Sequence, residues 1–295
     1  MLMIDDKARK RMKCEICSSA LKSDVLPQTF RCPSCELYKS TFPILINEVQ
    51  RIDEAARAQA LRAIRTANFK QILDQCEDLL PAGATILDVG CAHGWFLKAA
   101  TARGYKATGI EPDRDMAAQA RASGCNVVFG FFPDALPSGE RFDFITFNDV
   151  FEHLPNVERM TRAVYERLKT GGHVLINLPV SNGVVFRYAR LAAKIGVTGP
   201  LRRMWQEGLP SPHLSYFSAE NLPKLMSKTG FVLVRHHSLE SIMVDGLYER
   251  IRYDKKVSTA TAIAMYGLAH LMRLFGRIAQ SDVQYFVFRK GEANG

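Results

Sequence analysis

Short apolar runs alternate with longer mixed stretches through the middle of this 295-residue chain. The apolar runs predict strands near residues 85–89, 106–110, 126–129, 142–147 and 173–178. Mixed stretches that separate them predict helices, and strands that alternate with helices form a parallel sheet covered on both faces. The pattern therefore predicts an α/β fold with a doubly wound, mostly parallel sheet.

The rest of the chain lies on either side of this alternation. A helix rich in Ala, Arg and Gln is predicted from Asp53 to about Leu80, where Pro81 and Gly83 stop it. No internal repeat and no low-complexity tract is present. We therefore expect three parts: a small module at 1–48, a linker helix at 49–81 and the α/β domain at 82–295.

Four cysteines near the start of the chain form two C-x-x-C pairs. Cys14 and Cys17 are separated from Cys32 and Cys35 by 14 residues, a spacing that lets two tight turns present four thiolates to one tetrahedral zinc ion. Disulfides or a redox motif are the alternatives, but no apolar signal segment follows Met1, so we expect reduced thiols. The sequence predicts a zinc ribbon whose metal supplies much of its stability.

Positive charge is concentrated in the last part of the chain. The formal net charge is +9, and residues 181–295 hold 16 Lys and Arg against 8 Asp and Glu. The charge-free segment 257–269 is too short to span a bilayer, so no transmembrane helix is expected. Either these basic residues form a solvated rim, or this C-terminal region binds an acidic substrate, RNA or the surface of a membrane. We expect a cytoplasmic protein.

Two acidic residues stand near the ends of neighbouring predicted strands. Asp88 and Gly90 close the first strand of the α/β domain, and Glu111 closes the second, 21 residues after Gly90. A strand, a glycine turn, a helix and a second strand ending in a carboxylate form the layout of a nucleoside-binding unit. Glu111 would accept hydrogen bonds from both ribose hydroxyls; a solvated helix cap before Pro112 is the alternative.

The turn between these strands indicates which nucleoside is bound. A dinucleotide site requires G-x-G-x-x-G, but the chain has Gly90, Ala92 and Trp95 at these positions, so two of the three glycines are missing. Gly90 and Gly94 instead fit a G-x-G-x-G turn. The run from Asp88 to Gly94 resembles the first motif of class I S-adenosylmethionine (SAM) methyltransferases. Ala92 departs from the family's middle glycine, and its methyl group would crowd the cofactor.

Three further segments carry the same resemblance. Arg141–Pro155 resembles the family's fourth strand with its Glu-His-Leu signature, and Leu168–Pro179 resembles a helix end, a glycine turn and the fifth strand. Pro212–Ser218 continues the likeness, which covers most of residues 82–237. The resemblance thus extends over the predicted α/β core.

The resemblance implies a Rossmann-like sheet of seven strands. In this family, the strands near 231–235 and 283–289 would form an antiparallel hairpin that closes the sheet. Residues near 181–212 and 238–281 would then be insertions, the second of them helical and over the substrate entrance.

The resemblance also assigns the cofactor site. The methionine and ribose side would be formed by four residues of the turn: Asp88, Gly90, Ala92 and Gly94. Glu111 would bind the ribose hydroxyls, and Asn148 would lie in the turn beside the cofactor. The acidic residue often found near the adenine is replaced here by Phe131. Adenine recognition would therefore depend on backbone groups and stacking.

Two histidines are the candidate catalytic residues. SAM has an activated methyl group on a cationic sulfur, so the protein must mainly align the acceptor and exclude water. An oxygen acceptor must also lose its proton, and His153 or His213 would accept it, with Asp149 and Glu152 as orienting groups. The alternatives are that Glu152 and His153 cap a helix near Asn156, and that His213 is structural.

The order of zinc ribbon, helix, SAM core and Pro-x-His motif resembles bacterial methyltransferases of ubiquinone, glycan and secondary-metabolite pathways, as does Cys35-Glu-Leu37-Tyr38. This resemblance implies a small-molecule, glycan or carrier-linked acceptor, methylated on a hydroxyl oxygen.

An rRNA base methyltransferase and a non-catalytic SAM-fold binding module are the alternatives. The turn at Asn148 lacks the Pro-Pro-aromatic sequence that grips exocyclic base nitrogens, which disfavours RNA. The acceptor, the methylated atom and the oligomeric state stay open.

Overall fold

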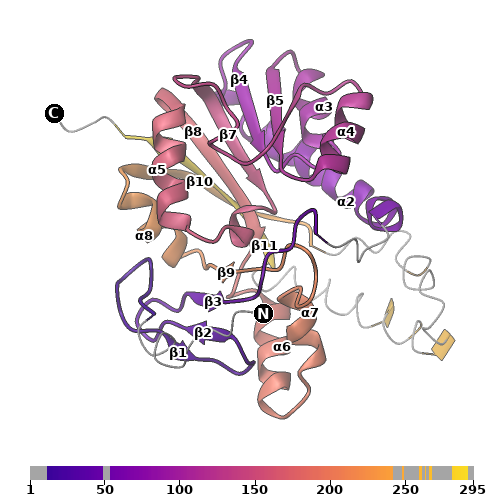
Figure 1. Ribbon diagram of the computed structural model, residues 1–295, viewed down its shortest axis with the longest axis vertical. Coiled ribbons are helices and arrows are strands. Elements are labelled where there is room, and N and C mark those ends of the chain that lie inside the picture. Colours follow the sequence, from indigo (N-terminus) through magenta and orange to yellow (C-terminus); the bar gives the residue numbers. More distant parts are fainter. Residues whose placement is uncertain are drawn as a thin grey trace.

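The computed structural model describes residues 12–48, 54–241 and 281–291, with a few isolated positions between 248 and 267. Its central sheet contains β4 (Thr85–Val89), β5 (Lys106–Glu111), β6 (Val127–Phe129), β7 (Phe142–Asn148), β8 (Leu168–Pro179), β10 (Phe231–Leu239) and β11 (Val283–Lys290). The strand order is β10-β11-β8-β7-β4-β5-β6 (Figure 1). Strands β4 to β8 are parallel, whereas β11 is antiparallel to both β8 and β10. The predicted seven-stranded, mostly parallel fold is confirmed.

Helices cover both faces of this sheet: α2 (Glu54–Gln75), α3 (Trp95–Thr101), α4 (Arg114–Ala122), α5 (Val157–Arg167) and α8 (Asn221–Ser227) (Figure 1). Side chains alternate across a strand, so neighbouring residues enter different cores. In β4, Ile86 joins a buried cluster with Phe69 of α2 and Phe96 of α3, whereas Leu87 joins a second cluster with Val164 of α5. The sheet is therefore doubly wound, as the apolar pattern predicted.

The helix before the sheet ends earlier than the sequence suggested. α2 ends at Gln75, and a short 3-10 turn, η1 (Glu77–Leu79), follows it. Leu80 then has an extended backbone, with φ −116° and ψ 114°. The ring of Pro81 disfavours the helical conformation in the residue that precedes it, which explains the extended Leu80.

A second, smaller sheet contains β1 (Lys22–Ser23), β2 (Thr29–Arg31), β3 (Tyr38–Ser40) and β9 (Ser215–Tyr216), all antiparallel. Its first three strands come from the cysteine-containing module, whereas β9 comes from the segment between β8 and α8. The expected insertion after β8 holds α6 (Val184–Lys194) and α7 (Gly199–Met204), beside this sheet in Figure 1. Tyr38, Phe186, Trp205 and Tyr216 form an aromatic core between them. The small module is therefore joined to the main domain by shared strands and a shared core.

The expected insertion at 238–281 lies mostly outside the described residues, as does the charge-free segment 257–269. Within the part of the chain that the structure describes, no helix has both the length and the apolar content needed to cross a membrane.

Candidate active site

The candidate site lies at the carboxyl ends of β4, β5 and β7. β4 pairs with β5 on one side and with β7 on the other, so the strand order reverses at this point. Ligands of open α/β sheets bind in the crevice at such a reversal. Glu111 and Asn148 are the last residues of β5 and β7, and Asp88 is the penultimate residue of β4. The fold therefore brings three of the predicted cofactor residues to one edge of the sheet.

Asp88 connects β4 to β7. Its Oδ1 accepts hydrogen bonds from the Thr146 hydroxyl at 2.7 Å and from the Asn148 side-chain amide at 3.0 Å. Burial raises the pKa of Asp88 to about 6, although these two hydrogen bonds oppose the rise. Asp88 thus fixes the orientation of Asn148, whose Oδ1 is buried and accepts no hydrogen bond from the described residues.

Glu111 connects β5 to the glycine turn. Its Oε2 accepts a hydrogen bond from the backbone N–H of Ala92 at 2.8 Å, and its Oε1 accepts one from Asp113 at 2.9 Å. Burial raises the pKa of Glu111 to about 7, and the charge of Asp88 adds to this rise. The helix cap of α4 is Asp113, whose carboxylate accepts two backbone N–H groups of the first turn. Glu111 is therefore buried, and its interpretation as a solvated helix cap is wrong.

The turn after β4 has three residues in the left-handed backbone region. The φ angles of Gly90, Ala92 and Gly94 are 72°, 44° and 70°. A Cβ atom at Gly90 would lie 2.6 Å from a methyl group of Val150, and one at Gly94 would lie 2.6 Å from the sulfur of Cys125. Both positions therefore require glycine. Ala92 tolerates a conformation that costs an L-residue about 1 kcal/mol.

The two predicted catalytic histidines come together from distant parts of the chain. His153 ends η2 (Phe151–His153), the turn that follows β7, and His213 precedes β9. Their rings are 4.7 Å apart between centroids, and the Nε2 atom of each lies 3.9 Å from Oε1 of Glu152. The Leu214 N–H donates to the backbone oxygen of Glu152 at 2.8 Å, which holds the two segments together.

Hydrogen bonds define the protonation of both rings. Nδ1 of His153 lies 2.9 Å from the Pro212 carbonyl oxygen, and a carbonyl can only accept, so this nitrogen carries the proton. The Tyr216 hydroxyl donates to the Met204 carbonyl at 2.8 Å and therefore accepts from Nδ1 of His213 at 2.9 Å. In the neutral state of each ring, the lone pair is on Nε2, the nitrogen that faces Glu152.

Glu152 is a buried carboxyl group with 1% exposure, and its two oxygens accept no hydrogen bond from the described residues. Burial, with the nearby charge of Asp149, raises its pKa well above the ordinary value. Asp149 itself pairs with Arg65 of α2 at 3.0 Å. The carboxyl group therefore lies in a place where a cationic partner would be strongly favoured.

The first turn of α5 is capped by other residues. The Asn156 side chain accepts the Arg159 N–H at 2.8 Å, and Glu15 of the cysteine module accepts the Val157 N–H at 3.3 Å. The capping alternative for Glu152 and His153 is therefore wrong.

A cavity of about 410 Å³ opens beside His213. Apolar residues of α6 and α7 form one part of its wall, and polar residues form the rest: Arg203, Gln206, His213 and Tyr216. Tyr216 lines this cavity, whereas the next residue, Phe217, is fully buried in the core of the main domain. The cavity offers room for a molecule with an apolar body and an anionic or polar group.

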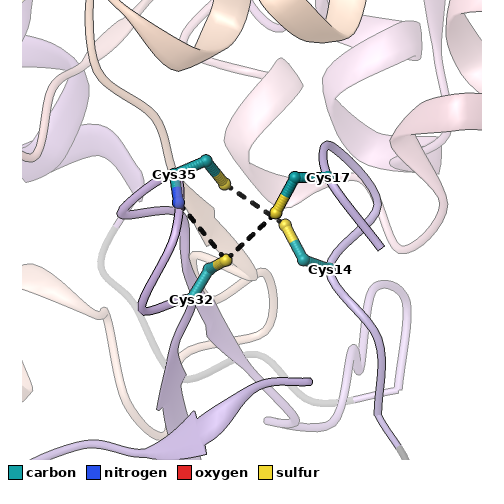
Figure 2. A group of neighbouring side chains, drawn as sticks. All are labelled: Cys14, Cys17, Cys32 and Cys35. Carbon is teal, nitrogen blue, oxygen red and sulfur yellow. Dashed lines mark hydrogen bonds between the residues drawn. The ribbon is translucent and has the colours of Figure 1, made fainter. Parts of the chain in front are cut away.

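The four N-terminal cysteines form one cluster. Their side chains point toward one another from two loops (Figure 2), with Cys14 3.3 Å from Cys35 and Cys17 3.3 Å from Cys32, sulfur to sulfur. None forms a disulfide. Burial raises the pKa values of Cys14 and Cys35, so these thiols would stay protonated without a cation. Four sulfur ligands within 4.8 Å of one another fit a tetrahedral zinc ion.

The cysteine module holds the segment that contains His213. The Ser40 hydroxyl donates to the His213 carbonyl at 2.7 Å, and its N–H donates to the Leu214 carbonyl at 2.9 Å. β3 also pairs with β9 directly after this segment. Asn221 of α8 donates to the Cys35 carbonyl at 3.1 Å. The module therefore positions one wall of the candidate acceptor site.

Comparison with known proteins agrees with this geometry. A family model described as "Methyltransferase domain" matches residues 59–236, more than half of the chain. The chain belongs to this methyltransferase family. The resemblance to class I SAM methyltransferases is thereby confirmed.

Curated relatives that match part of the chain are named as O-methyltransferases. The ubiquinone biosynthesis O-methyltransferases of Pseudomonas fluorescens and Pseudomonas putida are 32% identical to it over 120 residues. This stretch covers 38% of the chain and 52% of each relative, so the chain spans about half the length of the curated relatives it matches.

Solved structures share the fold. A Haloferax volcanii complex of the Trm112 methyltransferase activator with a methyltransferase gives a TM-score of 0.57 at 17% identity, covering 82% of this chain and 96% of that chain. The cyclopropane synthase MmaA2 from Mycobacterium tuberculosis gives 0.53 at 23% identity, covering 75% and 84%. At these identities the likeness shows the methyltransferase fold.

Some residues of the site were not expected from the sequence. Thr146 bonds Asp88 from β7, and its only sequence signal is that it lies two residues before Asn148, on the same face of the strand. Asn177 of β8 lies opposite Asn148 and also has a buried Oδ1 without a donor among the described residues. Gln206 is 2.9 Å from Nε2 of His213, and no motif pointed to it.

Proposed function

We propose that this methyltransferase binds SAM at the ends of β4, β5 and β7 and transfers its methyl group to a hydroxyl oxygen. The acceptor is a small-molecule, glycan or carrier-linked alcohol or phenol. The observation that carries this proposal is the cavity of about 410 Å³ that opens onto His213. The fold places His213 beside Glu152, and Glu152 follows the end of β7 by a few residues.

The chemistry of the crevice suits SAM. Each oxygen of Glu111 accepts one backbone N–H and has a further lone pair for a ribose hydroxyl. The buried Oδ1 of Asn148 lacks a donor, which the ammonium group of the methionine part would supply. Asp88 holds Asn148 in place, and the backbone of Gly90 to Gly94 forms the floor.

The adenine would bind beyond β6. Phe131 follows this strand and is 59% exposed, an unusual fraction for a large apolar side chain. An exposed aromatic ring at this position would stack on the adenine in place of the acidic residue that many family members have. Phe131 is therefore the proposed adenine contact.

The acceptor side would supply orientation and a proton acceptor. SAM, when bound, provides a methyl group activated by the sulfonium charge. Nε2 of His153 or His213 would accept the hydroxyl proton, so that the acceptor oxygen could bond to the methyl carbon while the C–S electron pair stayed on sulfur. The apolar wall of α6 and α7 would exclude water from this step, and Arg203 would bind an anionic group of the acceptor.

The four-cysteine cluster is the proposed structural zinc site. Cys14, Cys17, Cys32 and Cys35 would hold the ion, and β3 would transmit its stabilisation to the His213 segment. Elemental analysis of the purified chain should find zinc near one equivalent, and its absence would contradict this part of the proposal.

Direct assay of methyl transfer tests the function. The chain is incubated with SAM and separate sets of phenols, glycans, carrier-linked alcohols and structured RNA, and products are identified by mass spectrometry. We expect an O-methylated product from one hydroxyl class. His213→Asn should slow transfer at least tenfold without changing SAM affinity, whereas His237→Asn, an exposed histidine on β10, should leave both unchanged. Methylated RNA, or SAM binding with no product from any class, would contradict the proposal.

A further inference from the structure

Three ligand atoms with lone pairs meet on the acceptor side. One ligand atom from each of Glu152, His153 and His213 lies within 4.8 Å of the other two, and both Nε2 atoms are 3.9 Å from the same carboxylate oxygen. Nitrogen and oxygen ligands bind a transition-metal ion at about 2.0 to 2.2 Å, which places them roughly 3 to 3.5 Å apart. Small side-chain movements would therefore bring the three atoms to the separations that one metal ion requires.

The rings are oriented as metal ligands usually are. A histidine that binds a metal through one nitrogen commonly donates the other N–H to a carbonyl or another acceptor, which fixes the ring. Nδ1 of His153 donates to the Pro212 carbonyl, and Nδ1 of His213 donates to the Tyr216 hydroxyl, both at 2.9 Å. The remaining nitrogen of each ring faces Glu152.

Glu152 provides an independent observation. It is 1% exposed, and neither of its oxygens accepts a hydrogen bond from the described residues. A buried carboxylate without hydrogen bonds is costly, whereas a cation between it and two neutral imidazoles removes that cost. Asp149 adds a second negative charge nearby, and its own partner is Arg65.

We propose that Glu152, His153 and His213 bind one divalent transition-metal ion and that an acceptor oxygen completes its coordination. Two histidines and one carboxylate leave coordination positions open, and such sets suit zinc, iron, cobalt and related ions. The Gln206 amide, 2.9 Å from Nε2 of His213, would turn into the cavity that it lines. The ion would be separate from the four-cysteine site.

The role of the acceptor oxygen rests on the proposed function. A hydroxyl bound to the ion has a lowered pKa and loses its proton to water. Its oxygen then bonds to the methyl carbon, and the C–S electron pair stays on sulfur. In this form of the reaction the two histidines hold the ion, and the proton leaves through solvent.

Cobalt titration of the full chain that carries one equivalent of zinc, held by the four cysteines, tests the site. Co²⁺ bound by histidine and carboxylate gives visible d–d absorption without the thiolate charge-transfer band that Co²⁺ in the four-cysteine site would show. We expect one equivalent of Co²⁺ to bind with the first signature, while zinc stays bound. Glu152→Gln should weaken Co²⁺ binding at least tenfold. Glu158→Gln, the same change at a half-exposed carboxylate on α5, should bind Co²⁺ as the parent does.

A second variant guards against misfolding. His153→Asn keeps an N–H donor for the Pro212 carbonyl but removes Nε2, so it should also weaken Co²⁺ binding at least tenfold. Zinc content and SAM affinity report whether each variant is folded. Failure of the parent chain to bind a cobalt equivalent outside the cysteines would overturn the proposal, as would parent-like affinity in the folded variants.

Methyl transfer distinguishes this inference from the proposed function. O-methylation that persists with zinc in the cysteine site, no second metal and a chelator present would uphold the function and overturn the metal site. Cobalt binding lost in Glu152→Gln, without O-methylation of any hydroxyl class, would support the site while contradicting the function.

Discussion

The proposed cofactor crevice and the proposed acceptor side of this methyltransferase are built in different ways. The crevice uses strand ends and a turn from one stretch of chain, from Asp88 to Asn148. The acceptor side collects His153 from η2, His213 from the segment before β9, and the supporting strand β3 from the cysteine module. The first region depends on local backbone geometry, the second on contacts between distant segments. Damage to the cysteine module should therefore impair acceptor chemistry more than SAM binding.

Loss of zinc should have the largest effect. A structural zinc site contributes about 10 to 16 kcal/mol of apparent binding free energy at neutral pH, so Cys32→Ser should unfold the module and release β9 from β3. We expect methyl transfer to fall more than a hundredfold while SAM affinity changes by less than a few fold. Calorimetry with SAM and a turnover assay measure the two. Ser34→Ala, an exposed position between two of the cysteines, is the control. Equal losses of SAM binding and turnover in Cys32→Ser would remove the distinction between the regions.

Truncation of the aromatic core comes next. Trp205 is fully buried between the small sheet and α6, in contact with Phe42, Phe186 and Tyr216. Trp205→Ala should reduce the free energy of unfolding by about 3 to 5 kcal/mol because a large cavity remains. Chemical denaturation measures this loss. A SAM affinity that fell as much as the stability would show that the two regions are not separable.

The crevice should respond to pH through Glu111. Its pKa of about 7 lies above the ordinary value, so the folded state holds this proton more tightly than the unfolded state. The contribution of this proton to the free energy of unfolding is complete below the pKa that Glu111 has in the unfolded chain, and it is lost as pH rises through 7. The carboxylate accepts ribose hydroxyls, so SAM affinity should increase roughly tenfold from pH 6 to pH 8, following the ionised fraction. Calorimetry across this range should show the increase in the parent and a much flatter profile in Glu111→Gln.

Ala92→Gly should have the smallest effect. It relieves the left-handed backbone at φ 44° but gives the unfolded chain more freedom, so stability should change by no more than about 1 kcal/mol. Removal of the methyl group should leave SAM affinity equal or raise it a few fold. Thermal unfolding and calorimetry measure both. A clear loss of SAM affinity would mean that the methyl group contacts the cofactor rather than crowding it.

The sequence predicted the crevice better than the acceptor side, for physical reasons. Apolar runs located the strands, and parallel strands must bring their carboxyl ends together, so Glu111 and Asn148 could be placed in advance. The helix was predicted to reach about Leu80 because Pro81 was taken as its stop signal. Pro81 accounts for the extended Leu80, but no sequence signal marked the change from α-helix to a 3-10 turn after Gln75.

The acceptor side depends on tertiary contacts that local patterns do not encode. Pairing of β9 with β3 joins residues far apart in the chain, and the cavity beside α6 and α7 arises only when these helices meet the small sheet. His153, His213 and Glu152 were all named from the sequence, but only the fold shows that both imidazoles lie 3.9 Å from the same oxygen of Glu152.

SAM binding at Glu111 can be measured by calorimetric titration of SAM into the parent chain, Glu111→Gln and Glu140→Gln. We expect one SAM site per chain in the parent, affinity at least tenfold weaker in Glu111→Gln, or about 1.4 kcal/mol, and unchanged affinity in Glu140→Gln, where the carboxylate is exposed. Absence of SAM binding by the folded parent, or equal affinity in all three chains, would contradict this expectation.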